Sequence, residues 1–212
     1  MLASTLLLIV LGLPSAWLLS RRKWFGQSLL EMIVTLPLVF PPIALGFFLL
    51  LLLGRDGWVN QWLPSDFSIE LIFTFPALVL ASVIAGLPLM VKPIQTAWAN
   101  QTTHLVEASY GLGKTPWQTF WAITLPTLAP AIAAGLTLGL GRGLGEVGMS
   151  LMLGGNLIGH TDTLSLAIYN SVLDGDFACA QTFTWILAGL ALSLFILLRY
   201  FSRYKYLSIN KG

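Results

Sequence analysis

Charged residues and cysteine are scarce in this chain. Of its 212 residues only 9% are charged and 56% are hydrophobic, and the mean hydropathy is +0.81. Because soluble globular domains carry about 25% charged residues, this composition excludes an ordinary soluble domain and indicates an integral membrane protein. The net charge of +2 does not argue for a nucleic-acid partner. The one cysteine, Cys179, excludes an intrachain disulfide and a thiolate metal cluster.

Long apolar runs divide the sequence, and each approaches the roughly 20 residues that a helix needs to cross a bilayer. They predict an all-α integral membrane fold of about five transmembrane helices, with residues 1–212 as one domain. Three prolines in the second run predict a bent or locally unwound span, and polar residues 54–68 predict an outside loop. The predicted spans cover about 1–19, 29–53, 69–91, 128 to beyond 152, and 183–201.

The positive charges predict the orientation of the spans. Cytoplasmic segments carry an excess of Lys and Arg, which favours a multi-pass inner-membrane protein with its N-terminus outside and its C-terminus in the cytoplasm. A secretory signal is disfavoured, because signals begin with basic residues and this chain begins Met-Leu-Ala-Ser-Thr. This orientation places nine of the eleven basic residues on the cytoplasmic side: Arg21, Arg22, Lys23, Lys92, Lys114, Arg199, Arg203, Lys205 and Lys211.

The segment from Val91 to Pro126 is longer than the 2–8 residues that usually join neighbouring helices. Its aromatic residues argue against disorder, and its capping and turn residues predict a helix-turn-helix. The N-cap is expected at Thr102 or Thr103, the first helix is expected to end at Gly111 or Gly113, and Pro116 suits the start of the second. Exposed aromatics on a cytoplasmic surface favour docking of another protein; a loop lying on the lipid headgroups is the alternative.

The segment carries a motif. Glu107-Ala108-Ser109, three residues, Gly113, nine residues and Ile123-Thr124-Leu125-Pro126 resemble the E-A-A-x3-G-x9-I-x-L-P signature of permease subunits of binding-protein-dependent ABC importers. Ser109 departs from alanine, a small-for-small change. The resemblance implies that the segment forms coupling helices bound by an ATPase subunit. Glu107 would act as an acceptor in that contact or as a helix cap, and Gly113 would allow the bend.

Further stretches are similar to molybdate transporter permeases, notably residues 35–57, 86–97 and 141–169. Sulfate and tungstate permeases share parts of them, so these cargoes stay open as alternatives. Two features depart from the family: Ile158-Gly159-His160 stands where proline, glycine and arginine are more usual, and the lead before the first span is short. The short lead indicates either a misassigned start or a naturally short one.

The resemblance implies partners. We expect two copies of the permease to form the pore, two ATP-binding subunits at the cytoplasmic loop and a molybdate-binding protein outside the cell membrane, with lipid around the spans. The chain itself is expected to be non-catalytic, without a cofactor or metal. An intramembrane enzyme is a remote alternative, because His104, Ser150, His160, Asp162 and Cys179 match no metal or triad spacing. A passive channel is another.

Ionisable and polar residues near the fourth span are candidates for the transport pathway, because such residues are costly in a membrane. Arg142 and Glu146 are four residues apart and share one helix face, which favours a structural ion pair over contact with the anion. The candidates after them are Ser150, Asn156, Thr161 and Thr163, with loop solvation an equal alternative for Asn156.

The fourth span is rich in glycine, which permits close approach between helices or subunits and places this span beside the two-fold axis. Residues 164–173 are too few to cross the bilayer, and Asp174-Gly175-Asp176 resembles a turn. We therefore expect a short re-entrant or outer-leaflet helix that lines the pathway.

Overall fold

Helices make up the regular structure of the part of the chain that the computed structural model describes, namely residues 1–21, 24–55, 57–62 and 71–209. Several of these helices follow one another without an intervening loop. In chain order they are α1 (Leu2–Ser20), α2 (Gln27–Val39), α3 (Pro42–Leu53), α4 (Trp58–Trp62), α5 (Phe75–Ala97), the π-helix η2 (Trp98–Thr102), α6 (Thr103–Gly111), α7 (Pro116–Thr119), the π-helix η3 (Phe120–Thr124), α8 (Leu125–Leu144), α9 (Gly148–Gly154), α10 (Leu164–Leu173) and α11 (Phe177–Ile209).

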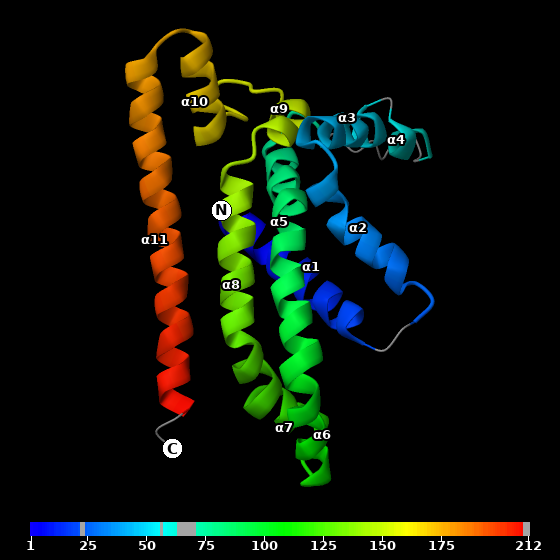
Figure 1. The fold of residues 1–212 in the computed structure, drawn as a ribbon. Helices are drawn as coiled ribbons and strands as arrows, with labels where there is room; N and C mark the ends of the chain where they lie inside the picture. Colours follow the sequence, from blue (N-terminus) through cyan, green and yellow to red (C-terminus); the bar gives the residue numbers. More distant parts are fainter. Residues whose placement is uncertain (22–23, 56, 63–70, 210–212) are drawn as a thin grey trace.

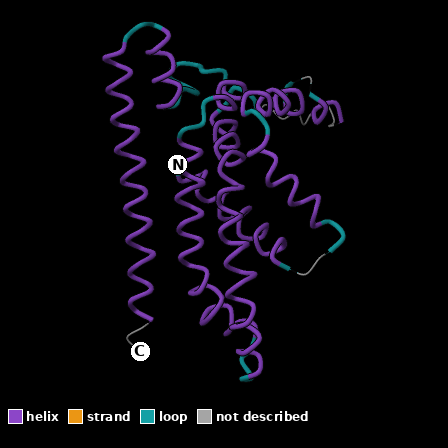
Figure 2. The backbone as a smooth tube through the Cα atoms, viewed as in Figure 1, coloured by secondary structure: helices purple, strands orange, loops and turns teal. Residues whose placement is uncertain are grey.

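Two long helices, α5 and α8, run side by side through the middle of the molecule, as Figure 1 shows. Helix α1 packs against α5, and α11 runs along the outer side of α8. Helices α6 and α7 lie at one end of the bundle, the end toward which α11 also runs (Figures 1 and 2). Helices α3, α9 and α10 lie at the opposite end. The motif-bearing segment and helices α9 and α10 therefore lie at opposite ends of the bundle.

Five helical stretches are long and apolar enough to cross a membrane, which confirms the predicted fold class. The last of them, in α11, is the least covered by the rest of this chain, since none of its apolar window is buried. α10 is one of two shorter apolar helices, and its bounds agree with the predicted short helix. The five stretches are Leu2–Ser20, Pro42–Trp62, Phe75–Asn100, Pro116–Leu144 and Phe177–Leu198.

The second span is interrupted, which confirms the predicted bent or locally unwound span. Helix α2 ends at Val39, Phe40 is extended, and Pro42 begins α3. Pro41 and Pro42 have no backbone N–H to continue the α2 hydrogen-bond ladder, which explains the break. Helix α3 then lies across the end of α5 (Figure 1).

The predicted outside loop at 54–68 is wrong in part, because residues 58–62 form α4, while residues 63–68 lie outside the described residues. Helix α5 runs to Ala97, so Lys92 lies within the helix and not after its end, where the sequence predicted it. The predicted start of the third span, near Ile69, also falls outside the described residues. The basic residues Arg22, Lys23 and Lys211 are likewise undescribed.

The predicted fourth and fifth spans have different bounds in the structure. Helix α8 begins at Leu125 and ends at Leu144, and a break at residues 145–147 separates it from α9. A continuous helix past Met152 is therefore wrong. Helix α11 begins at Phe177, six residues before the predicted Phe183, because Asp176 accepts a hydrogen bond from the Cys179 N–H at 3.0 Å and caps its first turn.

Glycines bring α5 and α8 into backbone contact. A Cβ on Gly139 would lie 2.9 Å from the Gly86 carbonyl oxygen, and one on Gly135 would lie 2.7 Å from the Met90 carbonyl oxygen. The Met90 side chain, fully buried, fills the space between these helices and Gly12 of α1. Small residues that allow close approach are typical of packed membrane helices. The sequence predicted that the α8 glycines permit close approach between helices or between subunits. In this chain they permit close approach between α8 and α5.

This contact predicts that Gly135→Ala destabilises the bundle, because its methyl group would overlap the Met90 backbone. We expect a loss of about 1–3 kcal/mol, the usual cost of overpacking, seen as a lower midpoint of thermal unfolding in detergent. Gly141→Ala is the matched control, since a Cβ at Gly141 meets nothing within 4 Å. Equal midpoints for the two variants would refute the close packing of α5 and α8.

Candidate functional site

The motif-bearing segment forms a helical hairpin that continues directly from two spans. Helix α5 passes through η2 into α6, and α7 passes through η3 into α8. The backbone is therefore already helical before Thr103, and the predicted N-cap at Thr102 or Thr103 is wrong. Helices α6 and α7 each join the neighbouring long helix through a π-helical turn of five residues. Such turns are rare in proteins as a whole, and those that occur are often found at functional sites.

The turn between α6 and α7 has the predicted chemistry. Helix α6 ends at Gly111, and Gly113 adopts φ +77°, a left-handed conformation that favours glycine. The Lys114 N–H then donates to the Ser109 carbonyl at 3.2 Å. Thr115 caps α7: its hydroxyl accepts from the Gln118 N–H at 3.3 Å, and its own N–H donates to Gln118 Oε1 at 3.1 Å.

A buried hydroxyl pair holds the two arms of the hairpin together. The Ser109 and Thr119 side-chain oxygens are 2.7 Å apart, and both residues are only 1% exposed. A helical serine usually bonds to its own backbone one turn earlier, whereas Ser109 bonds across to α7. The one departure from the family signature therefore supplies a cross-link that alanine lacks.

Aromatic side chains remain exposed on the hairpin. Trp117 is 70% exposed, and its ring lies 5.6 Å from that of Trp121 and 6.4 Å from that of Phe120. Leu112, at the tip, is 81% exposed. Exposed aromatic and aliphatic groups at one place mark interaction surfaces. We call Leu112, Trp117, Phe120 and Trp121 the hairpin patch.

The remaining motif residues divide between the surface and the base of the hairpin. Glu107 and Ala108 are exposed on α6, next to the patch. Ile123, Leu125 and Pro126 are half-buried where η3 joins α8. Because α6 has no free N-terminus, a capping role does not account for Glu107, and its carboxylate faces outward.

At the other end of α8, the predicted ion pair is present, although the helix ends between its partners. Arg142 Nη1 lies 2.6 Å from Glu146 Oε2, and the Glu146 side chain is 1% exposed. The second oxygen, Oε1, accepts from the Met149 N–H at 2.8 Å and so caps α9. The Ser165 hydroxyl donates to the Leu144 carbonyl at 2.5 Å and satisfies the end of α8. The carboxylate thus bridges the break.

A cavity of about 200 Å³ adjoins this break. It brings together Glu146, Ser150 and Thr163, three of the predicted pathway residues. Sequence reasoning missed Ser4 and Ser82, which line it from α1 and α5; a lone serine within an apolar run carried no distinguishing signal. The other polar lining residues are His160 and Asp162.

Asn156 and Thr161 are engaged elsewhere. The side-chain amides of Asn156 and Asn170 pair reciprocally, at 2.8 and 3.2 Å. The Thr161 hydroxyl donates to the Gly154 carbonyl at 2.5 Å and accepts from the Leu157 N–H at 2.9 Å. Thr163, in turn, caps α10 by accepting from the Leu166 N–H at 3.2 Å. These bonds secure the segment between α9 and α10. Within the described residues, no group of three His, Cys, Asp or Glu side chains is placed to hold a metal ion.

A membrane helical bundle with such a hairpin between two spans defines a transporter permease. The family described as binding-protein-dependent transport system inner membrane component matches residues 8–205, and the chain belongs to this family. It is thus a multi-pass component of an inner membrane.

Among curated proteins, the chain is 36% identical to the molybdenum transport system permease protein ModB of Haemophilus influenzae, over 92% of this chain and 85% of that one. The ModB of Azotobacter vinelandii is 35% identical over 92% and 85%. The sulfate transport system permease protein CysW of Synechococcus elongatus is 31% identical over 88% of this chain and 65% of that one.

Among solved structures, the fold is similar to a chain of a bacterial alginate ABC transporter in complex with alginate pentasaccharide-bound periplasmic protein. The TM-score is 0.69 at 23% sequence identity, covering 95% of this chain and 76% of that chain. The likeness confirms the permease fold.

The hydroxyl pair predicts a non-additive double-mutant cycle. Ser109→Ala and Thr119→Val each leave one buried hydroxyl without its partner, so each is expected to cost about 1–3 kcal/mol. The double variant removes both hydroxyls and is expected to cost less than the sum. Unfolding in detergent micelles by added denaturant measures the three losses. Strict additivity would show that the two hydroxyls do not interact.

The ion pair predicts unequal effects at its two positions. Arg142→Gln leaves a buried Glu146 carboxylate without a counter-charge and is expected to lower the thermal midpoint clearly. Glu146→Gln keeps a side-chain oxygen for the Met149 N–H and frees an arginine that is 34% exposed, so its effect is expected to be smaller. The double variant should recover part of the Arg142→Gln loss, and a double variant less stable than Arg142→Gln would contradict this assignment.

Proposed function

We propose that this chain is the membrane permease of an ABC importer that moves molybdate from an extracytoplasmic binding protein into the cytoplasm. The observation that carries the proposal is the hairpin patch, an exposed surface formed by Leu112 at the turn after α6 and by aromatic residues of α7 and η3, in a hairpin whose two arms are continuous with α5 and α8. A partner bound there can move both spans at once. Tungstate or sulfate is the alternative cargo of the same class.

The energy source is proposed to be a separate ATPase subunit that binds the hairpin patch. Aromatic anchors surrounded by other contacts supply most of the energy of protein interfaces, and Glu107 and Lys114 add charged groups beside them. In this proposal Glu107 and Ala108 contact the ATPase, Ser109 and Gly113 hold the bend, and Ile123, Leu125 and Pro126 join the hairpin to α8.

The choice of molybdate rests on the relatives with the highest identities quoted above, which carry molybdenum transport in their names, whereas the sulfate permease is less similar and longer. A passive channel would have no use for the hairpin patch. We place the hairpin and the end of α11 in the cytoplasm and the N-terminus outside. The whole of 1–212 is proposed to act as one permease domain.

Two copies are proposed to form the pore, with two ATPases below and one binding protein above. Closed two-fold symmetry is the common form of such assemblies, and α11, so little covered in a single chain, leaves surface for the second copy or lipid. The cavity with Glu146, Ser150 and Thr163 is proposed to lie along the route. Arg142, Asn156 and Thr161 are proposed to support its wall through the bonds described above.

The docking role predicts that Trp117→Gln weakens binding of the ATPase subunit by roughly 2 kcal/mol or more, as expected for an interface anchor. Trp62→Gln is the matched control: Trp62 is 90% exposed against 70% for Trp117, and α4 and α7 lie at opposite ends of the bundle. Co-purification with the ATPase measures binding.

The wild-type complex is reconstituted in liposomes with its cytoplasmic face toward the lumen and its binding protein outside. It is expected to accumulate labelled molybdate in the lumen only when the lumen contains ATP. Accumulation without ATP would make the chain a channel, and ATP-driven uptake of sulfate in place of molybdate would change the cargo.

A further inference from the structure

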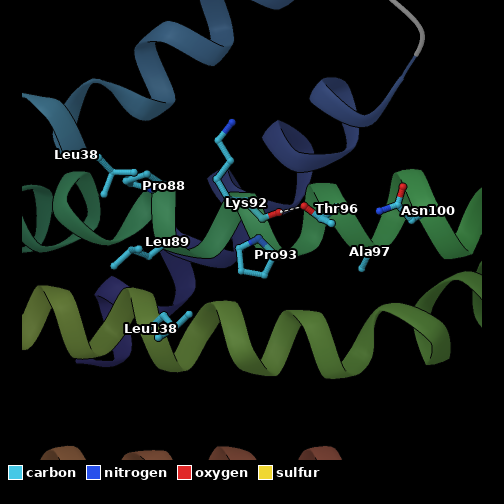
Figure 3. Close-up of a pocket in the computed structure, with 9 residues that line it drawn as sticks. All are labelled: Leu38, Pro88, Leu89, Lys92, Pro93, Thr96, Ala97, Asn100 and Leu138. Atoms are coloured by element: carbon cyan, nitrogen blue, oxygen red, sulfur yellow. Dashed lines mark hydrogen bonds between the residues drawn. The ribbon is translucent and has the colours of Figure 1, made fainter.

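A groove of about 580 Å³ runs along one face of α5, and the function proposed so far makes no use of it. Figure 3 shows its lining: Leu38 of α2 on one side, Leu138 of α8 on the other, and the α5 face between them. Three of the lining residues of α5 and η2 are polar and follow one another at intervals of four along the same helical face. They are Lys92, Thr96 and Asn100.

Lys92 forms an ion pair whose two side chains are both partly exposed. Its Nζ lies 2.6 Å from Glu31 Oε1 of α2, and the two side chains are 38% and 44% exposed. By contrast, the Glu146 carboxylate of the Arg142–Glu146 ion pair is 1% exposed and also accepts a hydrogen bond from a backbone N–H. The Lys92 ammonium keeps donor capacity beyond its one bond to Glu31. The Lys92 and Arg142 side chains are similarly exposed, at 38% and 34%, but the acidic partner of Lys92 is open and the acidic partner of Arg142 is buried.

The groove has a mainly apolar lining, and the charge of Lys92 is the feature that is unsuited to lipid. Lys92 lies inside the candidate span Phe75–Asn100, and half-exposed charges in a span face protein or a water-filled cavity, because hydrocarbon does not solvate them. The other sides of α5 are already covered, since Val83, Met90, Val91 and Ile94 are at most 2% exposed. Among the described residues, α5 opens toward the cavity at the α8–α9 break through Ser82 and toward this groove through Lys92 and Thr96.

The pairing also suits passage rather than capture. A lone lysine in a low-dielectric groove would hold a doubly charged anion tightly, whereas Glu31 competes for the same ammonium and promotes release. Conduction requires a contact favourable enough to enter and weak enough to leave. Asn100 adds amide donors on the same face, whereas the Thr96 hydroxyl donates its proton to the Lys92 carbonyl at 3.0 Å and so offers no donor to an anion.

We infer that this groove is part of the aqueous route and that Lys92 makes a transient contact with the tetrahedral oxyanion cargo, exchanging Glu31 for the anion. The inference rests on the proposed function for the identity of the cargo. It adds a contact site far along α5 from the cavity at the α8–α9 break, on the part of the span that leads to the hairpin (Figure 1).

Charge exchange at this pair tests the contact. In the complete transporter, Lys92→Gln is expected to lower molybdate import roughly tenfold or more, as for loss of a charged hydrogen bond, and Lys92→Arg is expected to retain import. The swapped double variant Glu31→Lys with Lys92→Glu re-forms the ion pair but moves the cation to α2, and it is expected to stay impaired. Full import by the swapped variant would show that the pair is structural only and would overturn the inference.

Solvent access tests the route independently. Lys92→Cys in a Cys179→Ser background, within the assembled transporter, is expected to react with a charged, water-soluble thiol reagent. No reaction in any nucleotide state would mean that lipid or a second copy covers the groove, which overturns the inference. Co-purification of each variant with the ATPase subunit confirms that it folds.

The two levels of the proposal fail in different ways. A wild-type complex that does not import molybdate refutes the proposed cargo. A wild-type complex that imports normally, together with a Lys92→Gln complex that does the same, refutes only the contact at Lys92.

Discussion

The need to satisfy backbone hydrogen bonds away from water governs this structure. In hydrocarbon a free N–H or C=O group is costly, so a helix can end inside the membrane only where other groups replace the missing bonds. At the α8–α9 break the replacements are side chains: Glu146 accepts from the Met149 N–H, and Ser165 donates to the Leu144 carbonyl. The irregular backbone is therefore stable, and a polar cavity can exist beside it.

The same bundle offers a physical link between its ends. Helices α5 and α8 touch through backbone at Gly86 and Gly139, a contact with no flexible side chain to absorb movement. Both helices continue through π-helical turns into the hairpin, whose arms are joined by Ser109 and Thr119. A displacement of the hairpin patch therefore has a packed path to the α8–α9 break. Two discrete arrangements of such a packed unit are what coupling between distant sites requires.

Hydropathy and turn chemistry in the sequence predicted much of the fold and part of the candidate site. The short helix 164–173, the turn at Gly113, the Pro116 start and the pairing of Arg142 with Glu146 follow from length, glycine, proline and spacing. The break after Leu144 was missed, because apolar residues continue across it and a hydropathy window does not register a lost hydrogen bond. The Ser109–Thr119 and Asn156–Asn170 pairs join residues 10 and 14 positions apart, beyond any helical periodicity.

Placement of Lys92 shows why charge alone misleads. A lysine after an apolar run predicts a membrane boundary, yet here Glu31 neutralises it inside α5. With Arg142 held by Glu146, each of these two cations in the described helices has an acidic partner. An anion passing such a lining meets no uncompensated positive charge deep enough to retain it. Under the proposed function, selectivity then comes chiefly from the binding protein, and the permease needs only contacts that break as readily as they form.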